Sequence, residues 1–237
     1  MNGMTITLIT GANKGLGFET ARQLVAAGHT VYAAARDADR GRVAADKLGA
    51  RFVQLDVADD ASVAAAAEFV RADSGGLDVL VNNAGILGAG KLGERIGELT
   101  GDDLINTFNT NLFGPVRVTN AFLPLLRASA SPVVVNVSSG LGSIALCADP
   151  SRAESRVVAL DYNSSKTALV MVTAQYATAF PAIRFNAVDP GYTATDMNGH
   201  AGPQTVEEGA EILVRMATIG PDGPTGTFVD RHGPVAW

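Results

Sequence analysis

The sequence predicts one α/β domain, with a mainly parallel sheet of seven strands and helices on both faces, and three observations lead to this fold class. Short apolar, β-branched runs alternate with longer segments of helical periodicity along the whole chain, which is typical of a buried parallel sheet. Of the 237 residues, 47% are hydrophobic, enough for a large core. No repeat and no Pro- or Ser-rich linker divides the chain, so we expect residues 1–237 to form a single domain.

The apolar runs predict the strands, and the segments between most of them predict helices. Strands are expected at 5–10, 30–35, 51–55, 77–81, 132–137, 183–188 and 226–229. Helices are expected at 16–27, 38–48, 60–71, 102–127, 161–179 and 205–218. Asp59 is a candidate N-cap of the third helix, and the long helix at 102–127 contains Pro115 and Pro124.

Composition argues against several classes of function. The chain has 18 basic and 24 acidic residues and no basic block, so we expect neither a nucleic acid nor a membrane as partner. No apolar run approaches the roughly 20 residues of a membrane span, and the N-terminus has no signal-peptide pattern. The three histidines form no metal-ligand cluster, so no metal is expected. The single Cys147 cannot form an internal disulfide, which favours a cytoplasmic location.

A glycine-rich turn follows the first predicted strand and opens the first predicted helix. Glycines allow a tight turn and close approach to phosphates, and the helix N-terminus offers free N–H groups to an anion. The spacing G-x-x-x-G-x-G differs from the G-x-G-x-x-G dinucleotide pattern, and a turn without a ligand is the alternative. We expect a doubly wound, Rossmann-type domain that holds a dinucleotide with Gly11, Asn13, Lys14, Gly15, Leu16 and Gly17.

The end of the second strand favours NADP(H) over NAD(H). A free ribose 2′-hydroxyl is usually bound by an acid at this place, whereas an arginine binds a 2′-phosphate. Here Arg36 follows the strand with no acid before it, and Lys14 adds a second cation. The alternative is that both are solvated charges, and Asp37 directly after Arg36 weakens the argument. Asp56 ends the third strand and is expected either to accept from the adenine amino group or to cap a turn.

Tyr162 and Lys166 are four residues apart, which places both on one face of a predicted helix. A neighbouring ammonium lowers the pKa of a phenol, so this tyrosine could exchange a proton near neutral pH. Alone, such a pair is often an ordinary surface pair. Ser138 and Ser139 end the fifth strand, however, and carboxyl ends of parallel strands share the rim where ligands bind.

Together these motifs resemble the short-chain dehydrogenase/reductase family over essentially the whole chain. The matching segments are TGANKGLG (10–17), LD (55–56), NNAG (82–85), Asn111 in TNLFG, NVSS (136–139), YNSSK (162–166) and PGYTAT (190–195). They follow the family's order, and the set is specific although each member is weak. The resemblance implies a small-molecule partner and an NADP(H)-dependent enzyme that reduces an aldehyde or ketone to an alcohol by hydride transfer.

The resemblance also implies roles for individual residues. Tyr162 would donate the proton in reduction, and Lys166 would lower its pKa and bind the nicotinamide ribose. Ser139 would bind the substrate oxygen, with Ser138 as the alternative, and Asn111 would hold a water that relays protons from Lys166. The remaining expected cofactor contacts are Asp56, Val57, Asn83, Ala84 and Gly85 towards the adenosine, and Pro190, Gly191, Thr193 and Thr195 towards the nicotinamide.

The spacing between Ser139 and Tyr162 departs from the family pattern. It is 23 residues (162 − 139), where most members have about a dozen, and this resembles the carbonyl-reductase branch. We expect a surface loop at about 145–160 and a mobile substrate lid at about 192–205, with Tyr192 in contact with the substrate. Met197 and His200 are further candidates.

Two rival functions keep the fold and change the chemistry. One is an NADP-binding regulator without turnover, which the presence of the whole tyrosine, lysine, serine and asparagine set argues against. The other is an epimerase or dehydratase, and such chains are generally longer. The substrate, the direction in the cell and the oligomeric state stay open between a dimer, a tetramer and a monomer.

Overall fold

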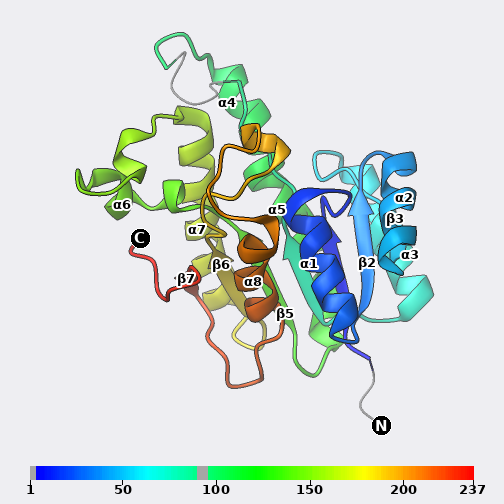
Figure 1. Cartoon of the computed structure of the whole chain (residues 1–237). Coiled ribbons are helices and arrows are strands. Elements are labelled where there is room, and N and C mark those ends of the chain that lie inside the picture. Colours follow the sequence, from blue (N-terminus) through cyan, green and yellow to red (C-terminus); the bar gives the residue numbers. More distant parts are fainter. Residues whose placement is uncertain (1–3, 90–95) are drawn as a thin grey trace.

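A sheet of seven parallel strands forms the centre of the computed structural model, which describes residues 4–89 and 96–237 (Figure 1). Its order is β3-β2-β1-β4-β5-β6-β7, and every neighbouring pair is parallel. The strands are β1 (Ile6–Thr10), β2 (Thr30–Ala35), β3 (Arg51–Gln54), β4 (Val79–Asn82), β5 (Val133–Val137), β6 (Arg184–Val188) and β7 (Thr227–Val229). The predicted fold class is confirmed, with strand ends shifted by up to two residues.

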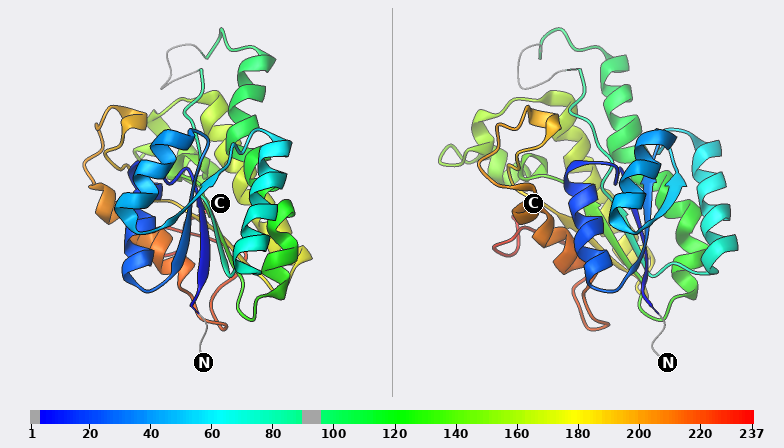
Figure 2. Two further views of the ribbon diagram at one scale, coloured as in Figure 1. Left: turned by 90° about the vertical axis from the view of Figure 1, so that its right-hand side faces the viewer. Right: turned by 45° about the vertical axis from the view of Figure 1, so that its right-hand side comes forward.

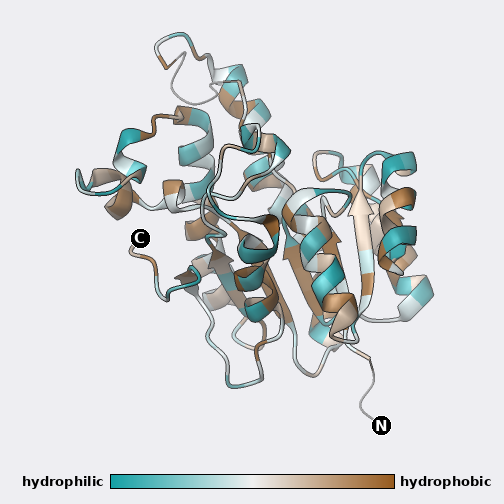
Figure 3. Cartoon of the chain, viewed as in Figure 1, coloured by the Kyte–Doolittle hydropathy of each residue, from teal (hydrophilic) through white to brown (hydrophobic). Residues whose placement is uncertain are grey.

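Helices cover both faces of the sheet (Figure 2). On one face lie α1 (Gly15–Ala26), α2 (Ala38–Leu48) and α8 (Val206–Ala217), and on the other α3 (Asp60–Ser74), α5 (Gly114–Ala128) and α7 (Leu160–Ala179). Successive strand residues point to opposite faces, so Val134 packs in one core and Val135 in the other. The strands are therefore apolar on both sides, as their colour in Figure 3 shows.

Helix starts follow the local chemistry of the sequence. The Asp59 carboxylate accepts hydrogen bonds from the N–H groups of Ala61 and Ser62, so it is the N-cap of α3 as predicted. Thr205 caps α8 together with Glu208 in a capping box. None of the described helices is long and apolar enough to cross a membrane.

The long helix expected at 102–127 is present in extent but is not regular. It consists of α4 (Gly101–Phe108), a π-helical turn (Asn109–Phe113) and α5. Pro115 stands in the first turn of α5, where no N–H is needed, and Pro124 lies inside that helix. The π turn carries the buried Asn111, whose amide group bonds to backbone outside the helix.

The segment at 145–160 is not the plain surface loop that the sequence predicted. It contains α6 (Ile144–Ala148) and a 3₁₀ turn (Glu154–Arg156). The C-terminal tail packs beside α6, because the Ser143 hydroxyl donates to the Ala236 carbonyl at 2.6 Å and the Ala145 N–H to the Trp237 carbonyl at 3.1 Å (Figure 1). These backbone contacts order the segment in a way that its polar composition did not indicate.

Candidate active site

A cavity of about 540 Å³ opens at the carboxyl ends of the strands. Its lining comes from the glycine turn, the ends of β2 to β5, helix α7 and the segment after β6. The expected residues that line it are Gly11, Asn13, Lys14, Gly15, Leu16, Gly17, Arg36, Asp56, Val57, Asn83, Ala84, Gly85, Ser138, Tyr162, Lys166, Pro190 and Thr195. Asn111, Ser139, Gly191, Tyr192 and Thr193 are not part of the lining.

The glycine turn is packed so closely that side chains are excluded. A Cβ atom on Gly17 would lie 2.5 Å from the Gly11 carbonyl oxygen and 2.4 Å from Asn83 Nδ2. Gly11 and Gly15 have φ of +66° and +56°, a conformation that favours glycine. The turn therefore exposes its backbone and the N-terminus of α1 to the cavity, which suits a diphosphate.

The NNAG segment fixes this turn from the neighbouring strand. The Thr10 hydroxyl accepts from the N–H groups of Asn83 and Ala84 at 2.9 and 3.0 Å. The Asn83 amide donates in return to the carbonyls of Thr10 at 2.8 Å and Gly11 at 3.2 Å. Asn83 thus shapes the cavity mainly by holding the glycine turn in place.

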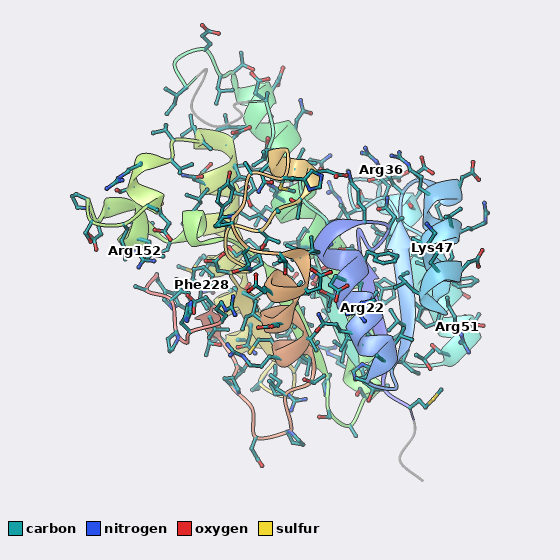
Figure 4. All side chains as sticks on the ribbon, viewed as in Figure 1. Arg22, Arg36, Lys47, Arg51, Arg152 and Phe228 are labelled. Atoms are coloured by element: carbon teal, nitrogen blue, oxygen red, sulfur yellow. The ribbon has the colours of Figure 1, made fainter. Side chains whose placement is uncertain are left out.

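The cationic end of the cavity contains both predicted cations. Arg36 is exposed at the carboxyl end of β2 (Figure 4), and no ion pair of the described residues involves it. Lys14 Nζ lies 2.8 Å from Asp196 Oδ2, an exposed pair between the glycine turn and the predicted lid. Asp37 turns away from the cavity, because its carboxylate accepts from the Arg40 N–H and guanidinium at the start of α2. Hydrogen bonds from Arg40 lower the pKa of that carboxyl.

Asp56 caps a turn, as one of its two expected roles required, while the contact with adenine stays a prediction. It lines the cavity beside Val57, and its Oδ1 also accepts from the Ala58 N–H at 3.0 Å. Its own N–H is bonded to the Ser62 hydroxyl on α3 at 2.9 Å, which fixes the end of β3. The carboxylate therefore caps a turn while it still borders the cavity.

Tyr162 and Lys166 are buried next to each other on α7. Lys166 Nζ donates to the Val137 carbonyl at 2.7 Å and lies 5.7 Å from the centroid of the Tyr162 ring. Burial lowers the pKa of Lys166 to about 8 and raises the pKa of Tyr162 to about 12. The expected low pKa of Tyr162 is therefore not found in this arrangement, because loss of water around the phenolate outweighs the other influences.

The two serines after β5 have different partners. The buried Ser138 hydroxyl donates to the Lys166 carbonyl at 3.1 Å and so joins the strand end to α7. Burial raises the pKa of Tyr162, and the neighbouring Ser139 hydroxyl acts in the opposite direction and lowers it. The Ser139 oxygen also accepts from the Leu141 N–H at 3.2 Å. Of the two serines, Ser139 is thus the one whose hydroxyl acts on the phenol.

The Asn111 side chain is wholly buried and its amide is bonded within the protein. Oδ1 accepts from the Ile86 N–H at 2.8 Å, and Nδ2 donates to the Ile86 carbonyl at 2.9 Å and the Ser165 hydroxyl at 3.1 Å. It still lies near the lysine, since a Cβ atom on Gly85 would be 3.4 Å from Oδ1 and 3.5 Å from Lys166 Nζ. The relay water expected at Asn111 stays a prediction.

The segment after β6 meets the cavity at only some of the expected residues. The buried Thr193 hydroxyl accepts from the Gln204 side chain at 3.1 Å, which holds the segment together. Tyr192 is 53% exposed. Met197 lines the cavity, whereas the His200 side chain lies 3.0 Å from the Asp196 carboxylate.

Several residues that line the cavity were not predicted from the sequence. Ile86 and Leu87 directly follow NNAG, and an apolar pair after a buried strand was the available signal. Asp196 follows PGYTAT, but its pairing with Lys14 spans 182 positions and has no local signature. The others are Ala35, Leu55, Ala58, Thr110 and Val137. Among the described residues no group of three His, Cys, Asp or Glu side chains is placed to hold a metal ion.

Comparison with known proteins agrees with this site. Residues 5–205 match the sequence profile of the short chain dehydrogenase family. The chain is 34% identical to (-)-isopiperitenone reductase of Mentha piperita, over 97% of each chain, and 36% identical to (+)-neomenthol dehydrogenase of Arabidopsis thaliana, over 94% of this chain and 95% of the relative. The crystal structure of an NADPH-bound carbonyl reductase from chicken fatty liver superposes with a TM-score of 0.86, at 30% identity over 99% of both chains. This chain belongs to the short-chain dehydrogenase family.

Proposed function

We propose that the protein is an NADP(H)-dependent oxidoreductase that reduces the carbonyl group of an aldehyde or ketone to an alcohol. The observation that carries this proposal is the placement of Tyr162, Ser139 and Lys166 beside one cavity whose far end holds Lys14 and Arg36. Proton chemistry and the binding of a phosphorylated dinucleotide would thereby be combined in one cleft.

The cavity fits a nicotinamide dinucleotide. The glycine turn would hold the diphosphate, because a Cβ atom at Gly17 would collide with backbone and the α1 N-terminus faces the space. Asp56, Val57 and Asn83 to Gly85 would border the adenosine, and Pro190, Gly191, Thr193 and Thr195 would border the nicotinamide. When bound, the nicotinamide supplies the hydride.

A preference for NADP(H) rests on charge at the adenosine end. Among the described residues Arg36 has no acidic partner, and Asp37, the acid that could bind a free 2′-hydroxyl, is engaged at the start of α2. Lys14 adds a second positive charge at the border of the same cavity. The guanidinium and the ammonium would bind the 2′-phosphate. The chicken carbonyl reductase, which this chain resembles, was solved with NADPH.

The proton chemistry follows from the polar groups around the phenol. The hydroxyls of Ser139 and Tyr162 would both donate hydrogen bonds to the substrate oxygen, and Tyr162 would transfer its proton as the alkoxide forms. Lys166 would bind the nicotinamide ribose hydroxyls with its ammonium. Ser138 would serve the structure only, since its hydroxyl is already bonded to α7. Asn111 would hold a relay water next to Lys166.

The substrate end of the cleft is apolar. Ile86, Leu87 and Met197 line it, and an apolar ketone or aldehyde suits this surface better than a charged sugar or acid. The relatives named for isopiperitenone and neomenthol support this class. The segment at about 192–205, with Tyr192, would act as the lid, and the 145–160 segment would border the mouth. The free thiol of Cys147 supports a reducing, cytoplasmic location.

The proposal is tested by binding and turnover with purified protein. NADPH and NADH are titrated while nicotinamide fluorescence is followed, and cyclic and aliphatic ketones and aldehydes are then added while NADPH absorbance is recorded. We expect tighter binding of NADPH and turnover that is lost in Tyr162→Phe. The Tyr176→Phe variant is the matched control, because that hydroxyl is bonded to Asn120 on the surface. Binding without turnover on the whole panel would favour the regulator instead.

A further inference from the structure

Asp189 connects the two loops that flank the phenol. It directly follows β6, and its Oδ1 accepts from the Gly191 N–H at 2.9 Å. The backbone N–H of Gly140, the residue after Ser139, is close enough to the same carboxyl group to lower its pKa. The approach is close, since a Cβ atom on Gly140 would lie 2.9 Å from Asp189 Oδ2. One carboxyl group therefore ties the loop that carries Ser139 to the loop that begins with Pro190.

A second carboxyl group from the 145–160 segment lies beside the first. Glu154 Oε1 would be 3.2 Å from the same Cβ position on Gly140. Arg152 approaches that oxygen at 3.3 Å, while Glu154 Oε2 is buried and has no hydrogen-bond partner in the described part of the chain. Within the described part of the chain, the 145–160 segment thus places a carboxylate oxygen without a hydrogen-bond partner behind the loop that carries Ser139.

Two further elements carry titratable groups near Asp189. Asp230, after β7, adds a further negative charge, although its own Oδ1 is bonded to the N–H groups of His232 and Gly233. Tyr162 on α7 is close enough for the charge of Asp189 to act on its hydroxyl, whereas Lys166, one turn further along α7, is held by the Val137 carbonyl. Burial and these acidic neighbours raise the pKa of Asp189. The negative charge of Asp189 in turn raises the pKa of Tyr162.

We propose that Asp189 is a positioning residue of this active site, which joins the loop that carries Ser139 to the loop that begins with Pro190 and so fixes both loops around Tyr162. The inference rests on the proposed function of Tyr162 as proton donor. In reduction the phenol must keep its proton until the substrate oxygen takes it, and a nearby negative charge holds that proton in place. Glu154 lies beside Asp189, so the 145–160 segment adds a second negative charge behind the loop that carries Ser139.

The test is the pH dependence of NADPH-driven reduction in Asp189→Asn. At saturating NADPH, where a loss of cofactor affinity no longer limits the rate, kcat falls at high pH as Tyr162 ionises, and removal of the Asp189 charge makes that ionisation easier. We expect the falling limb to move to lower pH by about one unit, the size of effect that a close charge has on a pKa. Glu154→Gln is the matched control. It should leave the falling limb in place, because Asp189, and not Glu154, is the carboxylate whose charge acts on the Tyr162 hydroxyl.

Gly140→Ala separates position from charge and also covers the case in which Asp189→Asn does not fold. The added Cβ displaces the carboxyl group without neutralising it, so we expect kcat to fall about tenfold and the limb to move in the same direction by less. NADPH affinity, followed by fluorescence, shows whether the cofactor loop has moved. The inference presupposes that the wild-type protein turns over and that this turnover depends on Tyr162. It would be overturned if Asp189→Asn left the falling limb of the pH profile unshifted. It would equally be overturned if Gly140→Ala left both kcat and the falling limb unchanged. A wild-type protein without NADPH binding or turnover would instead refute the proposed function.

Discussion

Replacement of Gly17 by alanine tests the packing of the glycine turn. The added Cβ would lie 2.5 Å from the Gly11 carbonyl oxygen and 2.4 Å from Asn83 Nδ2, so both must shift. Overpacking of this kind costs about 1–3 kcal/mol. The Asn83 amide also loses its bonds to the Thr10 and Gly11 carbonyls, at about 1 kcal/mol each. The free energy of unfolding should therefore fall by roughly 3–5 kcal/mol.

Thermal unfolding measures this loss directly. A change of 1 kcal/mol moves the Tm of a chain of this size by about 2–4 °C, so Gly17→Ala should lower the Tm by roughly 6–20 °C. Gly76→Ala is the matched control, because no atom lies within 4 Å of its Cβ position and its φ is not positive. We expect the control to keep its Tm or gain slightly. A Gly17→Ala protein with the Tm of this control and unchanged NADPH affinity would refute the close packing of the turn.

Three further predictions concern the cofactor end and the proton donor. In fluorescence titrations, Arg36→Ala should weaken NADPH binding by about 10- to 100-fold and leave NADH binding nearly unchanged. The reason is that a hydrogen bond to a charged group is worth about 1.5–3 kcal/mol. The control Arg127→Ala should change the affinity for neither cofactor. Ser139→Ala should lower kcat and keep the Tm. Ser138→Ala should instead lower the Tm by a few degrees, because the hydrogen bond to α7 is lost. Equal effects of the two variants on kcat and Tm would contradict the separate roles. NADPH affinity should decline as pH rises through about 8, the pKa to which burial lowers Lys166, because only the protonated ammonium would bind the ribose hydroxyls strongly. A Kd for NADPH that does not depend on pH, or the same decline in Lys166→Gln, would contradict that contact.

The regular parts of the fold could be predicted because their signals are local. Apolar, β-branched runs such as residues 133–137 can only be strands buried on both faces, and alternation with amphipathic helices dictates parallel pairing. Asp59 indicated the start of α3, because a helix N-cap depends on contacts within a few residues. The spacing of Tyr162 and Lys166, together with the glycine turn, is enough to predict the two ends of the site from the sequence.

The tertiary structure decided which polar groups are used and which are free. The sequence could not separate Ser138 from Ser139, because neighbouring residues at a strand end have the same local signal and differ only in which one faces α7. It predicted a low pKa for Tyr162 from a lysine one turn away, whereas burial reverses the direction.

Contacts between residues far apart in the chain could not be predicted from the sequence either. Lys14 meets Asp196 across 182 positions, and Asp189 meets the Glu154 of an insertion that had no helical or capping pattern of its own. Secondary structure follows mainly from neighbours along the chain, and the sequence determined the seven strands and the main helices, but neither α6 nor the π-helical turn. Burial, charge and hydrogen bonding at the site depend on segments brought together by folding, so only the assembled tertiary structure determined them.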